Sequence, residues 1–186
     1  MSCDLKASEV PGPHYQGDIF DIVGGGFDLM IAHPPCTYLS YAGTSSWNLP
    51  GRCEKRLAAL DFFRKLWEAP IERICLENPK GCASPTIAKY SQEIQPFHFG
   101  ESEYKTTWIW LKNLPPLVHI GLPDLFSNIT EAPPPEPRRV DKSGKRRHFV
   151  ESFSDTAKRA RTFQGIADAM ADQWGAILLR NPVYAH

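Results

Sequence analysis

Stretches of apolar residues that end at prolines predict three strands. Residues 27–32 (FDLMIA) are almost continuously apolar, and residues 71–76 (IERICL) and 106–111 (TTWIWL) form two further runs. Such runs are typical of strands that are buried on both faces, as in parallel sheets. Each run is followed by proline, which has no N–H group to donate to a neighbouring strand. These prolines stand at positions 34–35, 79 and 115–116.

Apolar residues at helical spacing predict two helices, over residues 52–67 and 166–179. Within each stretch the apolar positions recur every three or four residues, which places them on one face of a helix. They are Leu57, Leu60, Phe63, Leu66 and Trp67 in the first helix and Ile166, Ala169, Met170 and Trp174 in the second. Because strands and helices alternate along the chain, we expect an α/β fold with a mostly parallel sheet.

Residues 122–150 lose this periodicity. They hold the prolines at 133–135 and 137, followed by a basic run, which predicts an extended loop. No internal repeat is visible, and 186 residues is a typical length for one domain or slightly more. We therefore expect a single domain over residues 1–186, in which 122–150 is a Pro-rich and basic loop.

Composition and charge exclude several classes of protein. The 21 Lys and Arg residues balance the 21 Asp and Glu residues, which excludes a globally basic, histone-like binder of nucleic acid. No apolar run approaches the roughly 18 residues of a membrane span, and the N-terminus lacks the pattern of a secretory signal. The five cysteines have no regular spacing. We therefore expect reduced thiols in the cytoplasm, no metal site and no membrane contact.

Two of the predicted strands end in motifs that carry reactive groups. Pro-Pro-Cys stands at 34–36 and Glu-Asn-Pro at 77–79. Ligands of open parallel sheets bind beyond the carboxyl ends of the strands, and a crossover helix over 52–67 would make these two strands neighbours. A thiol and a carboxylate in one cleft suit covalent attack on an electron-poor ring. The thiolate adds to the ring, and the acid hydrogen-bonds the ring nitrogen that takes up charge.

These motifs resemble the signatures of the cytosine-5 DNA methyltransferases. Residues 28–43 (DLMIAHPPCTYLSYAG) are similar to that family's catalytic segment, and residues 74–79 (ICLENP) to its Glu-Asn signature. Residues 17–19 (GDI) resemble its Gly-Asp-Ile turn, and Asp4, after a short strand, resembles its ribose-binding acid. A phage-type subgroup of methyltransferase-like proteins shares HPPCTYLS, a later FG…K-T…W-LKNLPPL stretch and a closing R-T-F-x-GIA-x-AMA-x-QWG stretch.

The resemblance implies a covalent mechanism at Cys36. Cys36 would add to carbon 6 of cytosine, Glu77 would contact ring nitrogen 3, and Asn78 would orient the loop that holds the thiol. Pro35 belongs to the same catalytic set, because the two prolines would hold the thiol in a fixed direction. The target base would be flipped out of the duplex, since it is unreachable inside it.

S-adenosylmethionine is the cofactor that the resemblance implies. Asp4 would hold its ribose and Asp18 its adenine amino group, and Pro34 is a further expected cofactor-binding residue. The implied fold is a Rossmann-like class I methyltransferase sheet that lacks its first strand and the Gly-rich cofactor loop. The glycines at 24–26 do not replace that loop, because they precede a strand instead of following one. A second copy or a second polypeptide would then complete the sheet.

DNA contacts are expected from one basic segment. Residues 138–161 hold nine basic and three acidic residues, a net charge of +6, which suits contacts with phosphate. The family's Gln-x-Arg-x-Arg motif is absent, and Lys105 is a partial replacement. The loop at 122–150 stands in place of a target-recognition region. The expected DNA-binding residues are Lys105, Arg138, Arg139, Lys145, Arg146 and Arg147.

Three functions are compatible with these patterns. The first is a DNA cytosine-5 methyltransferase, active or inactive in this shortened form, in the cytoplasm of a bacterial host cell if it is encoded by a phage. The second is a non-catalytic relic that binds DNA through residues 138–161. The third is a thiol-dependent enzyme that modifies a free pyrimidine nucleotide. Thymidylate synthases use a similar Pro-Cys nucleophile, but they carry His after the cysteine, where this chain has Thr37.

Overall fold

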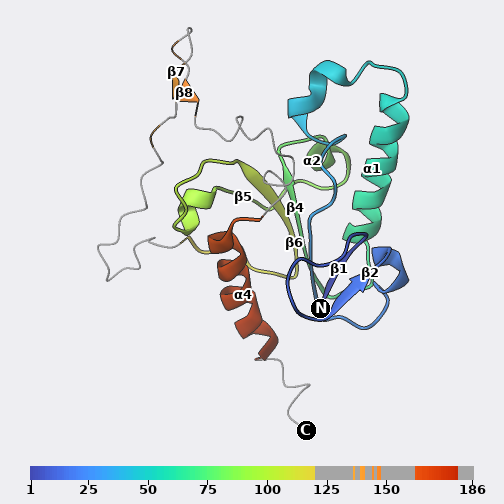
Figure 1. Cartoon of the computed structure of the whole chain (residues 1–186), viewed down its shortest axis with the longest axis vertical. Helices are drawn as coiled ribbons and strands as arrows, with labels where there is room; N and C mark the ends of the chain where they lie inside the picture. Colours follow the sequence, from blue (N-terminus) through green and yellow to red (C-terminus); the bar gives the residue numbers. More distant parts are fainter. Residues whose placement is uncertain (120–135, 137–138, 141–143, 145, 148–161, 180–186) are drawn as a thin grey trace.

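A computed structural model of the chain describes residues 1–119, 136, 139–140, 144, 146–147 and 162–179. Its centre is a four-stranded sheet with the strand order β3-β4-β6-β5 (Figure 1). The strands are β3 (Leu29–Ala32), β4 (Arg73–Pro79), β6 (Thr107–Lys112) and β5 (Gln92–Ile94).

Strand directions in this sheet are mixed, which corrects the expectation of a mostly parallel sheet. β3 and β4 are parallel, whereas β6 is antiparallel to both β4 and β5. β3, β4 and β5 therefore run in one direction and β6 runs against them. The reason lies in the connection from β5 to β6, which contains only the short 3-10 helix η3 (Pro96–Phe99). Without a long crossover, consecutive strands pair antiparallel.

Two further sheets have two strands each. β1 (Ser2–Asp4) is parallel to β2 (His14–Gln16), and β7 (Arg139–Val140) is antiparallel to β8 (Arg146–Arg147). Among the described residues, neither pair is hydrogen-bonded to the central sheet. The predicted mixture of helices and strands is thus confirmed, whereas the described strands do not form one continuous sheet, and the Rossmann-like arrangement stays a prediction.

Two long helices cover opposite faces of the central sheet. α1 (Arg52–Trp67) has the bounds that the sequence predicted, and α4 (Gln164–Leu179) begins two residues before the predicted start. In Figure 1 they lie on either side of the sheet. Within the described part of the chain, no helix is both long and apolar enough to span a membrane.

The two faces of the sheet belong to two hydrophobic clusters, between which the residues of β4 alternate. Leu76 packs with Phe63 of α1, and Cys75 packs with Trp174 of α4. All four side chains are fully buried. Successive residues of a strand point to opposite faces. The position of each residue in β4 therefore decides whether its side chain faces α1 or α4.

Short elements complete the described connections. They are η1 (Ile19–Asp21), η2 (Tyr41–Ser46) and α2 (Ala83–Thr86). The sequence did not predict β2 or β5, because three residues are too few to show a period. It also ended β4 too early, at residue 76. The Glu-Asn-Pro motif continues the strand, and Pro79 is its last residue.

Phe63→Ala is expected to lower the free energy of unfolding by about 3–5 kcal/mol, because the buried ring leaves a cavity when it is removed. The ring packs edge-to-face on Trp110, with 5.0 Å between the ring centroids. Leu57→Ala is a matched control on the same helix, since Leu57 is 60% exposed, and should cost less than about 0.5 kcal/mol. Urea unfolding measures the free energy of unfolding of both variants. An equal loss of this free energy in the two variants would contradict the orientation of α1.

Candidate active site

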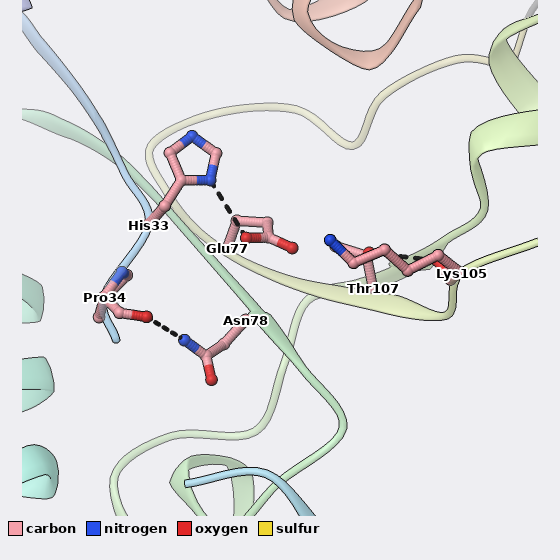
Figure 2. A network of polar contacts seen from close by, with 6 residues as sticks. All are labelled: His33, Pro34, Glu77, Asn78, Lys105 and Thr107. Atoms are coloured by element: carbon pink, nitrogen blue, oxygen red, sulfur yellow. Dashed lines mark hydrogen bonds and ion pairs between the residues drawn. The ribbon is translucent and has the colours of Figure 1, made fainter. Parts of the chain in front are cut away.

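The parallel register of β3 and β4 brings the two proline-containing motifs side by side. Ala32 pairs with Leu76, an offset of 44 residues. The same offset continues beyond β3, where His33 contacts Glu77 and Pro34 contacts Asn78 (Figure 2). The prediction that these two strands are neighbours is confirmed. The motifs meet at the carboxyl ends of both strands, which is where ligands of such sheets bind.

Asn78 fastens the segment that leads to Cys36. Its Nδ2 donates a hydrogen bond of 2.7 Å to the carbonyl oxygen of Pro34, and the residue is 1% exposed. Its Oδ1 is buried as well and has no hydrogen-bond partner in the described part of the chain. Breaking this hydrogen bond would cost free energy, because the buried amide would be left without a partner. The contact therefore holds the backbone at 34 against β4.

Glu77 lies on the opposite face of β4 from Asn78, towards the side that α4 covers. His33 Nδ1 and Glu77 Oε2 are 3.1 Å apart, and the side chains are 39% and 16% exposed respectively. β6 is antiparallel to β4, with Thr107 opposite Pro79, so the residues just before β6 reach the same end of β4. Figure 2 shows the side chain of Lys105 extending from there toward the Glu77 carboxylate. Sequence reasoning assigned no role to His33, although its place directly after β3 was a usable signal.

Cys36 lies in a tight turn that is exposed to solvent. Its carbonyl oxygen accepts the backbone N–H groups of Leu39 and Ser40, at 3.0 and 2.9 Å. Leu39 is fully buried and anchors the turn in the α1 cluster. The neighbouring Pro34 is buried and Pro35 is exposed. The thiol is thus presented at the surface by a backbone that is fixed on both sides.

The residues after β4 complete the fixation of this turn. Tyr41 N–H donates to the carbonyl of Lys80 at 3.0 Å, and Cys82 N–H donates to the carbonyl of Leu39 at 2.9 Å. Between them Gly81 forms a bridge with Ser40. A Cβ atom at position 81 would lie 2.3 Å from the carbonyl oxygen of Leu39, so only glycine allows this close approach.

The five cysteines differ in their accessibility, and none is in a disulfide. Cys36 and Cys53 are exposed, whereas Cys75 and Cys82 are buried. Burial raises the pKa of Cys75, to which the charge of Glu77 adds, and burial likewise raises the pKa of Cys82. Since the thiolate is the reactive form, the buried pair is poorly suited to nucleophilic chemistry, and exposure favours Cys36.

Asp4 and Asp18 lie together at the carboxyl ends of β1 and β2. Asp4 is the last residue of β1, and its Oδ1 accepts the N–H of Lys6 at 2.8 Å. Asp18 follows β2 and caps η1 by accepting the N–H of Phe20 at 3.0 Å. Both charges help to raise the pKa of Cys3, after the contribution of burial. The structure thus brings the two carboxylates into one neighbourhood.

Most of the expected DNA-binding segment lies outside the described residues, including Arg138 and Lys145. Of the other expected residues, Arg139 pairs with Arg147 between β7 and β8, and Val140 pairs with Arg146. The two tryptophans of the predicted strand 106–111 lie in the core, since Trp108 is 6% exposed and Trp110 is fully buried.

Cations and aromatic rings gather just after Cys36, a feature that sequence reasoning missed. The guanidinium of Arg52 lies 5.0 Å and the ammonium of Lys55 5.8 Å from the centre of the Tyr38 ring. Arg56 lies 4.1 Å from the centre of the Trp47 ring and donates to the Trp47 carbonyl at 3.1 Å. The basic residues at the start of α1, spaced by three and four positions, were the signal for this cluster.

The chain matches no known family model, no curated protein and no solved structure. Within the described part of the chain, no group of three or more His, Cys, Asp or Glu side chains is placed to hold a metal ion.

Asn78→Ala is expected to lower the free energy of unfolding by about 1–3 kcal/mol, because the buried carbonyl of Pro34 loses its partner. The rate at which iodoacetamide alkylates Cys36 should also change, because the turn that holds the thiol is released from β4. Asn48→Ala is the control, since Asn48 is exposed and should cost less than about 0.5 kcal/mol. An Asn78→Ala protein as stable as the Asn48→Ala control would contradict this role of the amide.

Alkylation should proceed at Cys36 and Cys53 before Cys82 and Cys75. The exposed thiols should react readily near pH 8, whereas the raised pKa of the buried pair reduces their thiolate fraction. The labelling of Cys75 and Cys82 should therefore begin to increase at a higher pH than the labelling of an exposed thiol. Mass spectrometry of peptides labelled at pH 7, 8 and 9 measures the order. Equal rates at Cys75 and Cys53 in the folded protein would argue against the described packing of β4.

Proposed function

We propose that the chain is a methyltransferase of the cytosine-5 DNA type, in which Cys36 is the nucleophile. The observation that carries the proposal is that His33 and Pro34, which lead to Cys36, contact Glu77 and Asn78 at the carboxyl ends of β3 and β4. The 2.7 Å hydrogen bond from Asn78 to Pro34 ties the nucleophile's loop to the strand that carries the acid. The resemblance of the two motifs assigns these residue types to attack on a pyrimidine ring.

In this mechanism the Cys36 thiolate forms a bond to carbon 6 of cytosine. The electron pair of the 5,6 double bond moves into the ring, and ring nitrogen 3 takes a proton from the Glu77 carboxyl group. Carbon 5 becomes nucleophilic and accepts a methyl group. Water then takes the proton from carbon 5, and the electron pair of that C–H bond restores the 5,6 double bond and expels the Cys36 thiolate. Ring nitrogen 3 returns its proton to the Glu77 carboxylate. The exposure of Cys36 suits a base that has been flipped out of its helix.

S-adenosylmethionine would supply the methyl group when bound. Asp4 and Asp18 suit it by their chemistry, because carboxylate oxygens accept hydrogen bonds from the hydroxyl and amino groups of a nucleoside. Each uses Oδ1 for a backbone N–H, and Oδ2 of each is the acceptor that we assign to the cofactor. Pro34 would contribute apolar contact beside the thiol. A second copy or a second polypeptide would complete the sheet around this site.

DNA is the substrate that we assign to the site. The pairs formed by Tyr38 with Arg52 and Lys55 support this assignment, because cations beside a ring two residues from Cys36 suit phosphate groups. Lys105 and the basic segment 138–161 would add further contacts. The cell compartment implied by such a substrate is the cytoplasm.

DNA that contains 5-fluorocytosine tests the proposal directly. After methyl transfer, carbon 5 carries fluorine and no proton, so the thiolate cannot be expelled and the protein stays bound to DNA. We expect a covalent complex with random-sequence DNA that forms only with S-adenosylmethionine and is lost in Cys36→Ser, seen as a shifted band on a denaturing gel.

Cys53→Ser is the matched control, because Cys53 is exposed like Cys36 and belongs to α1, outside the Pro-Pro-Cys motif; it should form the complex as well as the wild type. A wild-type protein that forms no complex, or a complex that survives Cys36→Ser, would refute the proposal. Salt-sensitive DNA binding without a covalent complex would instead favour the non-catalytic DNA-binding relic.

A further inference from the structure

His33 connects the partly shielded Glu77 carboxylate with solvent. The imidazole Nδ1 contacts Glu77 Oε2 at 3.1 Å, while the imidazole is 39% exposed and the carboxylate 16%. Figure 2 shows the second ring nitrogen pointing away from Glu77. One nitrogen of the ring thus faces the acid and the other leads away from it, an arrangement through which a proton can pass.

The sheet geometry fixes this contact. The 44-residue offset of β3 and β4 places position 33 beside position 77, and alternation along both strands puts the two side chains on the same face. This face is only partly covered at β3, where Ile31 is 38% exposed. A histidine at position 33 is therefore directed at Glu77 by the backbone.

Other charged groups surround the pair on the neighbouring elements. Lys105, before β6, extends toward the Glu77 carboxylate from the other side (Figure 2). Its ammonium also lies 5.8 Å from the centre of the Phe163 ring, just before α4. Glu101, in the loop that leads to Lys105, accepts the N–H of Gly165 at 3.0 Å. On the β3 side, the thiol of Cys36 is the nearest titratable group along the chain.

We propose that His33 is a positioning residue that relays a proton to Glu77 during attack by Cys36. This inference rests on the proposed function. As Cys36 bonds to carbon 6, the Glu77 carboxyl group gives its proton to ring nitrogen 3 and becomes a carboxylate. The imidazolium of His33 then passes its Nδ1 proton to Glu77 Oε2 and becomes a neutral imidazole that keeps its Nε2 proton. When the thiolate is expelled, Glu77 returns this proton to Nδ1 and takes back the proton of ring nitrogen 3.

His33→Asn separates this role from a structural one. The asparagine amide retains a donor near the position of Nδ1 and cannot titrate. Single-turnover formation of the 5-fluorocytosine complex, with saturating S-adenosylmethionine, is measured from pH 5.5 to 9. The wild-type rate should rise with pH as the Cys36 thiolate forms and fall as the imidazolium is lost, because imidazole changes its charge in this range.

In His33→Asn the rate near pH 7 should fall by about tenfold or more, a part of the roughly 10²- to 10⁴-fold that positioned proton transfer contributes. The falling limb of the pH profile should disappear, while the apparent affinity for DNA stays unchanged. Glu77→Gln should abolish the effect of His33→Asn when the two changes are combined, because the relay acts only through the carboxyl group. His14→Asn, on β2, is the control and should keep the wild-type profile.

The outcomes separate this inference from the proposed function. If the wild type forms a Cys36-dependent complex and His33→Asn keeps the same rate and falling limb, the relay is refuted and the methyltransferase proposal stands. A rate loss that is equal at every pH would likewise reduce His33 to a structural role. If the wild type forms no complex, both proposals fail.

Discussion

β3 and β4 pair in one parallel register, and the site depends on that pairing more than on any single side chain. The offset of 44 residues that joins Ala32 to Leu76 continues past the end of β3 and determines which groups meet there. Because side chains alternate along a strand, the same register directs Glu77 to the α4 face and Asn78 to the α1 face. The acid and the amide act on opposite sides of the sheet, and both reach the segment at 33–36.

The hydrophobic clusters on the two faces protect this register. A slip of one residue would turn Leu76 and Cys75 to the wrong helices and would place the Glu77 carboxylate in the α1 cluster. Burying an unpaired charge is costly, and Leu76 would leave the cluster that it shares with Phe63. The core that α1 and α4 complete therefore also fixes the chemistry at the sheet edge.

The sequence was sufficient to predict the elements that carry a long period or a long apolar run. The bounds of α1 were predicted to the residue, and β3, β4 and β6 were recognised by their runs and prolines. The direction of β6 was not predictable, because the apolar pattern of TTWIWL is the same for either direction and only the connection after β5 decides it. For the candidate site, the meeting of the two motifs followed from adjacent strands. The contact of His33 with Glu77 could not be predicted in this way, because it depends on the register between β3 and β4 as well as on their being neighbours.

The support of the Cys36 turn by residues 78–82 has a consequence for the history of the gene. Three hydrogen bonds bind the turn at 34–41 to that one segment, two of which form the bridge between Ser40 and Gly81, and Gly81 leaves no space between the two stretches. Neither stretch can lengthen or shorten alone without separating the thiol from the acid. Insertions and deletions should therefore be purged from both stretches together while accumulating elsewhere. Substitutions in one stretch should be inherited with compensating substitutions in the other, so that the two motifs evolve as a single unit although a whole helix of sequence lies between them.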